Sequence, residues 1–219
     1  EDRNTFSSLD QGDDQGIGLL ARLAHSIPIS AKDTTLRLLL GGDVESVSKN
    51  FRYVERYRAV EFERNWNAVN QPLDGDQVLA GAQFGVRGRK LGQVTYGLNT
   101  FQVVDRYNGW KQELISDLHL GKIDITGTGS WLNTTTPRES DFLRHKGQVR
   151  YRLPHFSVGL RDEHERNLYK VDSTSALQLG SYSFHDWEAF VQSPDSVKNK
   201  WRISGGQRED HALRNGELF

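Results

Sequence analysis

Residues 77–104 read QVLAGAQFGVRGRKLGQVTYGLNTFQVV, and this stretch decides the fold. Apolar side chains occupy every second position on both sides of the charged segment 87–90, and the positions between them carry mostly glycine, amide or hydroxyl groups. Successive side chains of a β-strand point to opposite faces, so this period of two predicts a β-hairpin with one apolar and one polar face. We expect Val94, Tyr96 and Leu98 to lie on the apolar face and to point outward.

The same alternation recurs along most of the chain. It predicts strands over residues 16–29, 34–47, 53–66, 110–120, 122–132, 141–153, 155–167, 176–187 and 200–209, which gives about ten or eleven strands with the first hairpin. Asn108-Gly109 predicts a tight turn, and residues 133–140 predict a Thr-rich loop. For 53–66 a helix is the competing interpretation, because Glu and Arg favour helices, but the aromatic and β-branched residues there favour a strand.

Length and charge limit the function classes. The chain has 219 residues, and we interpret residues 1–219 as a single domain that is part of a larger protein. A formal net charge of −1 provides no general attraction to nucleic acid, so we expect no nucleic-acid partner. No apolar run is long enough for a membrane helix, whereas a membrane strand needs only about 9 to 11 alternating residues.

The sequence contains no recognisable catalytic or ligand-binding motif. The chain lacks cysteine, and its seven histidines show no metal-ligand spacing such as H-E-x-x-H. The acidic segment 10–14 is interpreted as a turn rather than a calcium site. In the segment 162–165, His164 points away from Glu163 and Glu165 on a strand, so we interpret it as charged strand surface. We therefore predict no catalytic residues, no metal, no cofactor and no enzyme activity.

A ladder of charged residues is the most informative polar feature. Its members share one face of the hairpin predicted around Pro154: Arg144, Lys146, Arg150, Arg152, Arg161, Glu163 and Glu165. In a barrel this face lines the lumen, where charges of both signs pair across strands. The alternative is the solvated face of a soluble sheet.

Aromatic residues form a second set. Because amphipathic rings prefer the two membrane interfaces, we expect them mainly near strand ends. The predicted interfacial residues are Tyr53, Tyr57, Trp66, Tyr107, Trp110, Trp131 and Trp187.

Three segments resemble known proteins. Residues 51–67, FRYVERYRAVEFERNWN, resemble a segment of the large outer-membrane β-barrel proteins of Bacteroidota, and residues 3–10, RNTFSSLD, and 163–167, EHERN, are similar to the same group. The resemblance implies barrel strands joined by turns within a much longer protein. It also implies a role in envelope assembly, secretion or uptake, without catalytic residues.

The pattern and the resemblance together predict an all-β fold, an antiparallel up-and-down transmembrane β-barrel or part of one, in the bacterial outer membrane. We expect a pore, scaffold or subunit of an envelope transport or assembly complex. Its partners would be membrane lipid and either other envelope proteins or the remaining strands of a larger barrel, which it needs for closure. The alternative is a soluble all-β module that binds carbohydrate or protein, with Trp110, Trp131 and Trp187 as stacking platforms.

Overall fold

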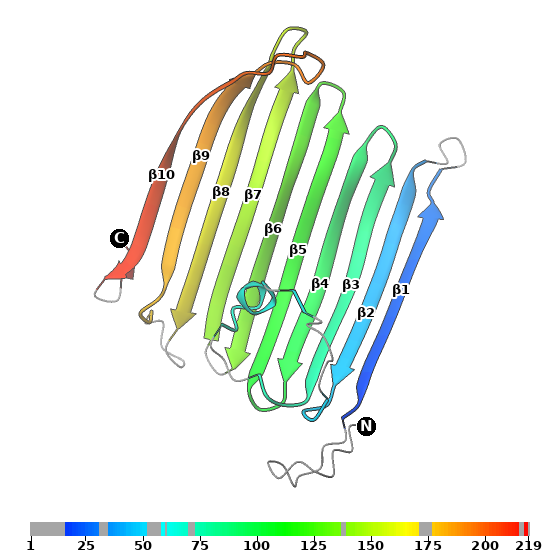
Figure 1. Ribbon diagram of the computed structural model, residues 1–219, viewed down its shortest axis with the longest axis vertical. Coiled ribbons are helices and arrows are strands. Elements are labelled where there is room, and N and C mark those ends of the chain that lie inside the picture. Colours follow the sequence, from blue (N-terminus) through cyan, green and yellow to red (C-terminus); the bar gives the residue numbers. More distant parts are fainter. Residues whose placement is uncertain are drawn as a thin grey trace.

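The computed structural model describes residues 16–30, 35–51, 58–59, 61–69, 73–136, 139–170, 177–214 and 217–218. In these ranges the chain forms one antiparallel sheet whose strands follow one another in sequence order (Figure 1). The strands are β1 (Gly18–Pro28), β2 (Arg37–Val47), β3 (Gln77–Gly88), β4 (Gly92–Val103), β5 (Tyr107–Leu120), β6 (Ile123–Thr136), β7 (Glu139–Arg152), β8 (Ser157–Lys170), β9 (Tyr182–Gln192), β10 (Arg202–Arg214) and the two-residue β11 (Glu217–Leu218). The prediction of an all-β, antiparallel up-and-down fold is confirmed.

The sheet is open rather than closed into a barrel. In the described part of the chain, β1 pairs with β2 alone, and β10 pairs with β9 and the short β11. The two edges therefore lie at opposite sides of the sheet (Figure 1).

The hairpin over residues 77–104 forms as its sequence pattern predicts. Strands β3 and β4 pair from Gln77 with Val103 to Gly88 with Gly92. Gly92 has a φ of 85°, and a Cβ at this position would collide with the carbonyl oxygen of Asp117. Only glycine fits there, because it tolerates positive φ and the close approach of the neighbouring backbone.

One predicted strand is wrong. Within 53–66 the structure has the short helix α1 (Phe62–Asn65), and residues 52–57 and 60 lie outside the described ranges. Phe62 and Trp66 are four residues apart, so they fall on one face of a helix as well as on one face of a strand. The helix ends before Asn67, whose φ of 52° lies in the left-handed region that asparagine tolerates.

Two predicted connections are also wrong. Asn108-Gly109 is not a turn: β5 already begins at Tyr107, and the turn before it contains Asp105, with a φ of 57°. The pairing of β5 with β6 shifts register between Asn108 and Gly109, so this glycine marks an irregularity inside the strand. The Thr-rich segment is mostly strand, since β6 continues to Thr136 and β7 begins at Glu139.

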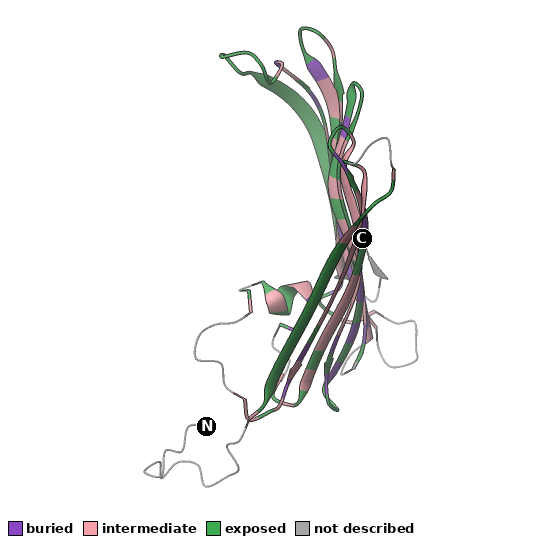
Figure 2. Ribbon diagram, turned by 90° about the vertical axis from the view of Figure 1, so that its right-hand side faces the viewer, coloured by how far each residue is buried: buried purple, intermediate pink, exposed green. Residues whose placement is uncertain are grey.

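The sheet is bowed, and α1 lies on its hollow side near one end of the strands (Figures 1 and 2). We call this side the concave face, the opposite side the convex face, and the strand ends near α1 the α1 end. The pairing registers place the alternating apolar residues, such as Val86, Val94 and Tyr96, on the convex face. Their sequence neighbours, such as Gln93 and Thr95, lie on the concave face with α1.

Apolar side chains on the convex face have no second layer above them among the described residues. Leu23 is 74% exposed, Leu160 61% and Ile203 71%. We call residues 61–69, which include α1, the α1 segment. The described hydrophobic core lies between this segment and the concave face, with Trp66, Phe101 and Leu132 at its centre. None of the described helices is long and apolar enough to cross a membrane.

Candidate functional site

The concave face carries the candidate site, and its α1 end is covered by an aromatic cluster. The Phe101 ring lies 5.1 Å from that of Phe62 and 5.5 Å from that of Trp66, measured between centroids. Tyr107 donates a hydrogen bond to the carbonyl oxygen of Trp66, and the Lys111 ammonium lies 4.7 Å from the Trp66 ring centroid. The α1 segment is therefore fixed to the sheet by packing, by a buried hydrogen bond and by a cation–π contact.

Polar contacts attach the end of α1 to strands β7 and β8. The Asn67 amide donates to Ser140 Oγ at 3.0 Å and to Asn167 Oδ1 at 3.1 Å. The side-chain oxygen Oδ1 of Asn67 accepts a hydrogen bond from Tyr169 Oη at 2.8 Å. Arg144 donates one to Asn65 Oδ1 at 2.9 Å. These bonds join residues 73 to 102 positions apart in the sequence, so they fix where α1 sits on the concave face.

The predicted charge ladder lies on this same face. The register pairs Arg144 with Glu165 and Lys146 with Glu163 across β7 and β8. Lys146 Nζ lies 3.1 Å from Glu163 Oε2, and Arg161 Nη2 lies 2.9 Å from the same oxygen. Glu165 accepts a hydrogen bond from Tyr182 rather than binding Arg144. The sequence thus placed the charges on one face, while the structure determines which of them pair.

The ladder continues across two further strands that the sequence prediction did not include. Glu188 on β9 lies 3.1 Å from Arg202 on β10 and 3.8 Å from Arg161 on β8. Alternation along residues 182–192 puts Glu188 on the face opposite to Trp187. The sequence pattern of this strand was therefore sufficient to assign Glu188 to the charged face. Lys146, Arg161, Glu188 and Arg202 line an open groove of about 720 Å³.

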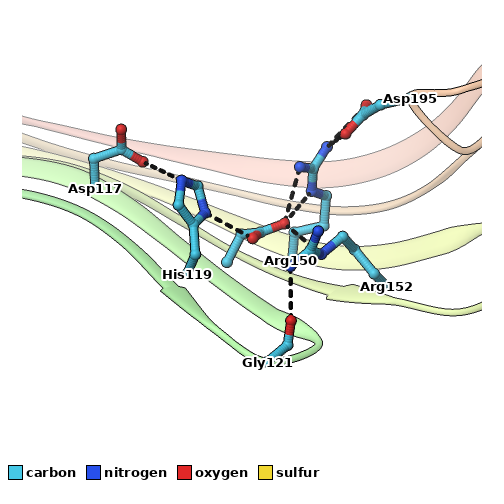
Figure 3. Close-up of polar contacts among 7 residues, drawn as sticks. Asp117, His119, Gly121, Arg150, Arg152 and Asp195 are labelled. Atoms are coloured by element: carbon cyan, nitrogen blue, oxygen red, sulfur yellow. Dashed lines mark hydrogen bonds and ion pairs between the residues drawn. The ribbon is translucent and has the colours of Figure 1, made fainter. Parts of the chain in front are cut away.

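Arg150 and Arg152 form a separate network around Asp124 (Figure 3), beside the β5–β6 turn at the end of the sheet far from α1 (Figure 1). Asp124 Oδ2 lies 2.9 Å from Arg150 Nη2 and 3.1 Å from Arg152 Nε, and its Oδ1 lies 2.9 Å from His119 Nδ1. Arg150 also pairs with Asp195 at 2.9 Å. The Asp124 carboxylate is nearly buried by these cations, whereas that of Asp195 is exposed. Asp124 therefore joins β5, β6 and β7 on the concave face.

This burial difference gives a testable prediction. Asp124→Asn removes the charge that two guanidinium groups share, and we expect it to lower the free energy of unfolding by about 2 kcal/mol, the scale of charge-assisted hydrogen bonds. Asp195→Asn is the matched control, because it removes an exposed carboxylate from the same Arg150, and we expect a loss below about 0.5 kcal/mol. Chemical denaturation of both variants measures the difference, and equal losses would contradict the role of Asp124.

The convex face carries a polar cluster that the sequence analysis missed. Asp162 on β8 bonds both His145 on β7 and His185 on β9, the latter at 2.5 Å. His164 lies between the two imidazoles, with ring centroids 5.6 Å and 5.7 Å away, and bonds Ser183 Oγ at 3.2 Å. We interpreted 162–165 as plain charged surface. The partners come from other strands, so only the register of β7 and β9 reveals them.

The predicted interfacial aromatics fall into three groups. Trp110, Trp131 and Trp187 lie on the convex face and are 43 to 48% exposed. Trp66 and Tyr107 are buried between α1 and the sheet, although Tyr107 is the first residue of β5 and so lies at a strand end as expected. Tyr53 and Tyr57 lie outside the described residues. Trp187 is in the middle of β9, which contradicts the expected position near a strand end.

No family model, curated protein or solved structure matches this chain. Across the described ranges, no group of three or more His, Asp or Glu side chains is arranged to hold a metal ion. In the Asp162 cluster, both flanking imidazoles bond the carboxylate itself. The arrangement on the concave face can form a polar wall with charges of both signs, and α1 narrows the space in front of it at one end (Figure 2).

Proposed function

We propose that the chain is a segment of a bacterial outer-membrane β-barrel, whose convex face contacts lipid and whose concave face forms the wall of a water-filled lumen. One observation carries this proposal: a single sheet exposes large apolar side chains on the face that no described element covers, and places its ladder of paired charges on the other. A soluble sandwich buries such a face against a second sheet. A membrane barrel turns it toward lipid.

Strand length and connectivity support the same proposal. Strands β1 to β10 contain 11 to 14 residues, and a tilted membrane strand needs about 9 to 11. Consecutive strands pair as neighbours throughout, which is the order of an up-and-down barrel. Within the described residues, the outer edge of β1 and most of that of β10 have no partner strand. In a membrane these edges require further strands, because backbone groups without partners are not tolerated in hydrocarbon.

Within this proposal the concave face acts as a pore wall, a scaffold or one side of a transport path. The paired ladder of Lys146, Glu163, Arg161 and Glu188 is suited to water rather than lipid. The α1 segment acts as an inward fold that reduces the lumen at one end. Envelope proteins or the remaining strands of a larger barrel are the proposed partners at the edges.

A carbohydrate-binding module is the second candidate. It is favoured by Trp110, Trp131 and Trp187, which expose their rings on one face of the sheet. This reading requires the convex face to be soluble without lipid, so the same experiment separates the two candidates.

The test compares refolding of residues 1–219 in buffer, in detergent micelles and in lipid vesicles. We expect strand-type circular dichroism with a dispersed protein in detergent, flotation with the vesicles, and aggregation in buffer, because the convex face needs an apolar solvent. A folded, soluble monomer in detergent-free buffer would contradict the proposal. Quenching of its tryptophan fluorescence by a polysaccharide would then support the carbohydrate module.

A further inference from the structure

The apolar region of the convex face has an oblique lower boundary. On β3 apolar residues continue to Val78, close to the α1 end, and on β5 the last one is Trp110, which is followed by Asn108 toward that end. On β8 the continuous run of convex apolar residues stops much earlier, at Leu160, and Asp162, His164 and Arg166 follow it before Leu168. The boundary therefore recedes from the α1 end as it crosses the sheet from β3 to β8.

The change from apolar to polar can be followed along a single row, that is, a series of residues that are paired across neighbouring strands, one from each strand. It passes through Phe84, Tyr96 and Leu114 on β3 to β5, and reaches His145, His164 and His185 on β7 to β9. One row thus begins among exposed aromatic and aliphatic side chains and ends in the cluster around Asp162. A boundary parallel to the rows would give all these positions the same polarity.

The three exposed tryptophans follow the boundary. Trp110 pairs with Asn133, and Trp131 lies two residues beyond Asn133 on β6, away from the α1 end. The successive pairs of Trp187 with Asp162, Asp162 with Gly147 and Gly147 with Gly127 place Trp187 level with Gly127 on β6. Gly127 lies four residues beyond Trp131, again away from the α1 end. On the convex face of each of these strands, the tryptophan is the last large apolar side chain before polar residues begin toward the α1 end. Tryptophan prefers this position at a membrane interface.

The slope of this line agrees with the tilt of strands in a barrel. Between Trp110 on β5 and Trp187 on β9 the line moves six residues away from the α1 end, two from β5 to β6 and four from β6 to β9. Over the same distance it crosses four strand spacings. With about 3.3 Å per residue and about 4.8 Å between strands, the angle to the rows is about 45°. Strands in membrane barrels tilt by about 35 to 45°, which inclines the rows by the same angle to the membrane plane.

The opposite boundary is displaced in the same direction. On β3 the last convex apolar residue at the far end is Val86, and the chain then turns through the charged segment 87–90. The row that contains Tyr151, Val158, Val191 and Ile203 lies beyond this level and is entirely apolar. Both limits of the apolar region therefore shift toward the far end between β3 and β10.

We propose that the edge of the bilayer crosses the convex face along Trp110, Trp131 and Trp187, so that the α1 ends of β7 to β10 extend into water. The cluster of Asp162 with His145, His164 and His185 then lies outside the hydrocarbon, where its charges are hydrated. This inference rests on the proposed membrane role and adds the position and slope of the lipid contact. It explains why Trp187 is in the middle of its strand: the interface itself crosses β9 there.

The test uses single cysteines, each of which is unique because the chain contains none. Phe84→Cys and His164→Cys lie in one row, and Leu160→Cys lies on the same strand as His164. Gln207→Cys, in register with Trp187, is a second probe of the polar side if His164→Cys fails to fold. Each variant is labelled with bimane and reconstituted as the full chain in phosphatidylcholine vesicles with brominated acyl chains.

We expect the bromine to quench bimane at Phe84 and Leu160, and aqueous iodide to quench it at His164 and Gln207. Equal quenching by lipid at Phe84 and His164 would overturn the oblique boundary and leave membrane insertion intact. Quenching by iodide alone at all four positions would overturn the proposed function itself. The two failures are therefore distinguishable in one set of measurements.

Discussion

We expect Leu114→Arg to destabilise the protein folded in lipid vesicles by about 2 to 4 kcal/mol, because the proposed lipid contact of the convex face would put this arginine in hydrocarbon near the bilayer midplane. Leu114 lies on the convex face of β5, in register with Tyr96 and Gly129, and is 48% exposed. Its place between Trp110 and Leu120 puts it well inside the apolar region. Equilibrium folding into lipid vesicles, measured over a denaturant series, gives the change.

The matched control is the next residue. Ile115 is 54% exposed but lies on the concave face, where it lines the open groove. An arginine there falls between Glu113 and Asp117 on the same face of β5, so we expect Ile115→Arg to change stability by less than about 0.5 kcal/mol. Two adjacent aliphatic residues of similar exposure differ only in the face they occupy. Equal effects of the two substitutions would argue against lipid on the convex face.

Much of this fold is encoded in local alternation. Parity along a strand depends only on the strand itself, so the pattern in residues 77–104 was sufficient to assign Val94 and Gln93 to opposite faces. The hairpin around Pro154 followed in the same way, and β7 and β8 pair there from Arg152 with Ser157 onward. The α1 segment was not recoverable in this way. Phe62 and Trp66 are four positions apart, a spacing that satisfies both the strand and the helix period.

The candidate site was only partly predictable for a related reason. Parity placed Arg150 and Arg152 on one face, but their shared partner Asp124 depends on the register of β6 with β7. The contacts of Asp162 with His145 and His185 need the registers of two pairings at once. Register is set by turn lengths and by neighbouring strands, and a single strand does not contain that information.

The contrast between the faces also explains why the tryptophans divide as they do. Trp66 is not on a strand, so its ring is free to pack onto the concave face, where Phe101 and Leu132 provide an apolar patch within a polar surface. No described residue covers Trp131 and Trp187 in this way, and they remain exposed on the convex face. Burial under α1 is thus a local exception on a face that is otherwise polar, and the stability of the α1 segment depends on it.

Trp66→Ala should release the α1 segment from the sheet. Removing a buried tryptophan from a packed cluster costs about 3 to 5 kcal/mol, and Trp66 is only 3% exposed. The expected readout is faster hydrogen exchange at the amides of Trp66 and Ala68, which bond to Phe62 and Glu63, while amides of β9 and β10 keep their protection. Val69→Ala, at a position 52% exposed, is the control and should change neither set.

If the concave face lines a lumen, the released segment should also raise single-channel conductance of the assembled barrel. Unchanged exchange at Trp66 and Ala68 in the variant would mean that contacts such as those of Asn67 with Asn167 hold α1 in place without the aromatic cluster.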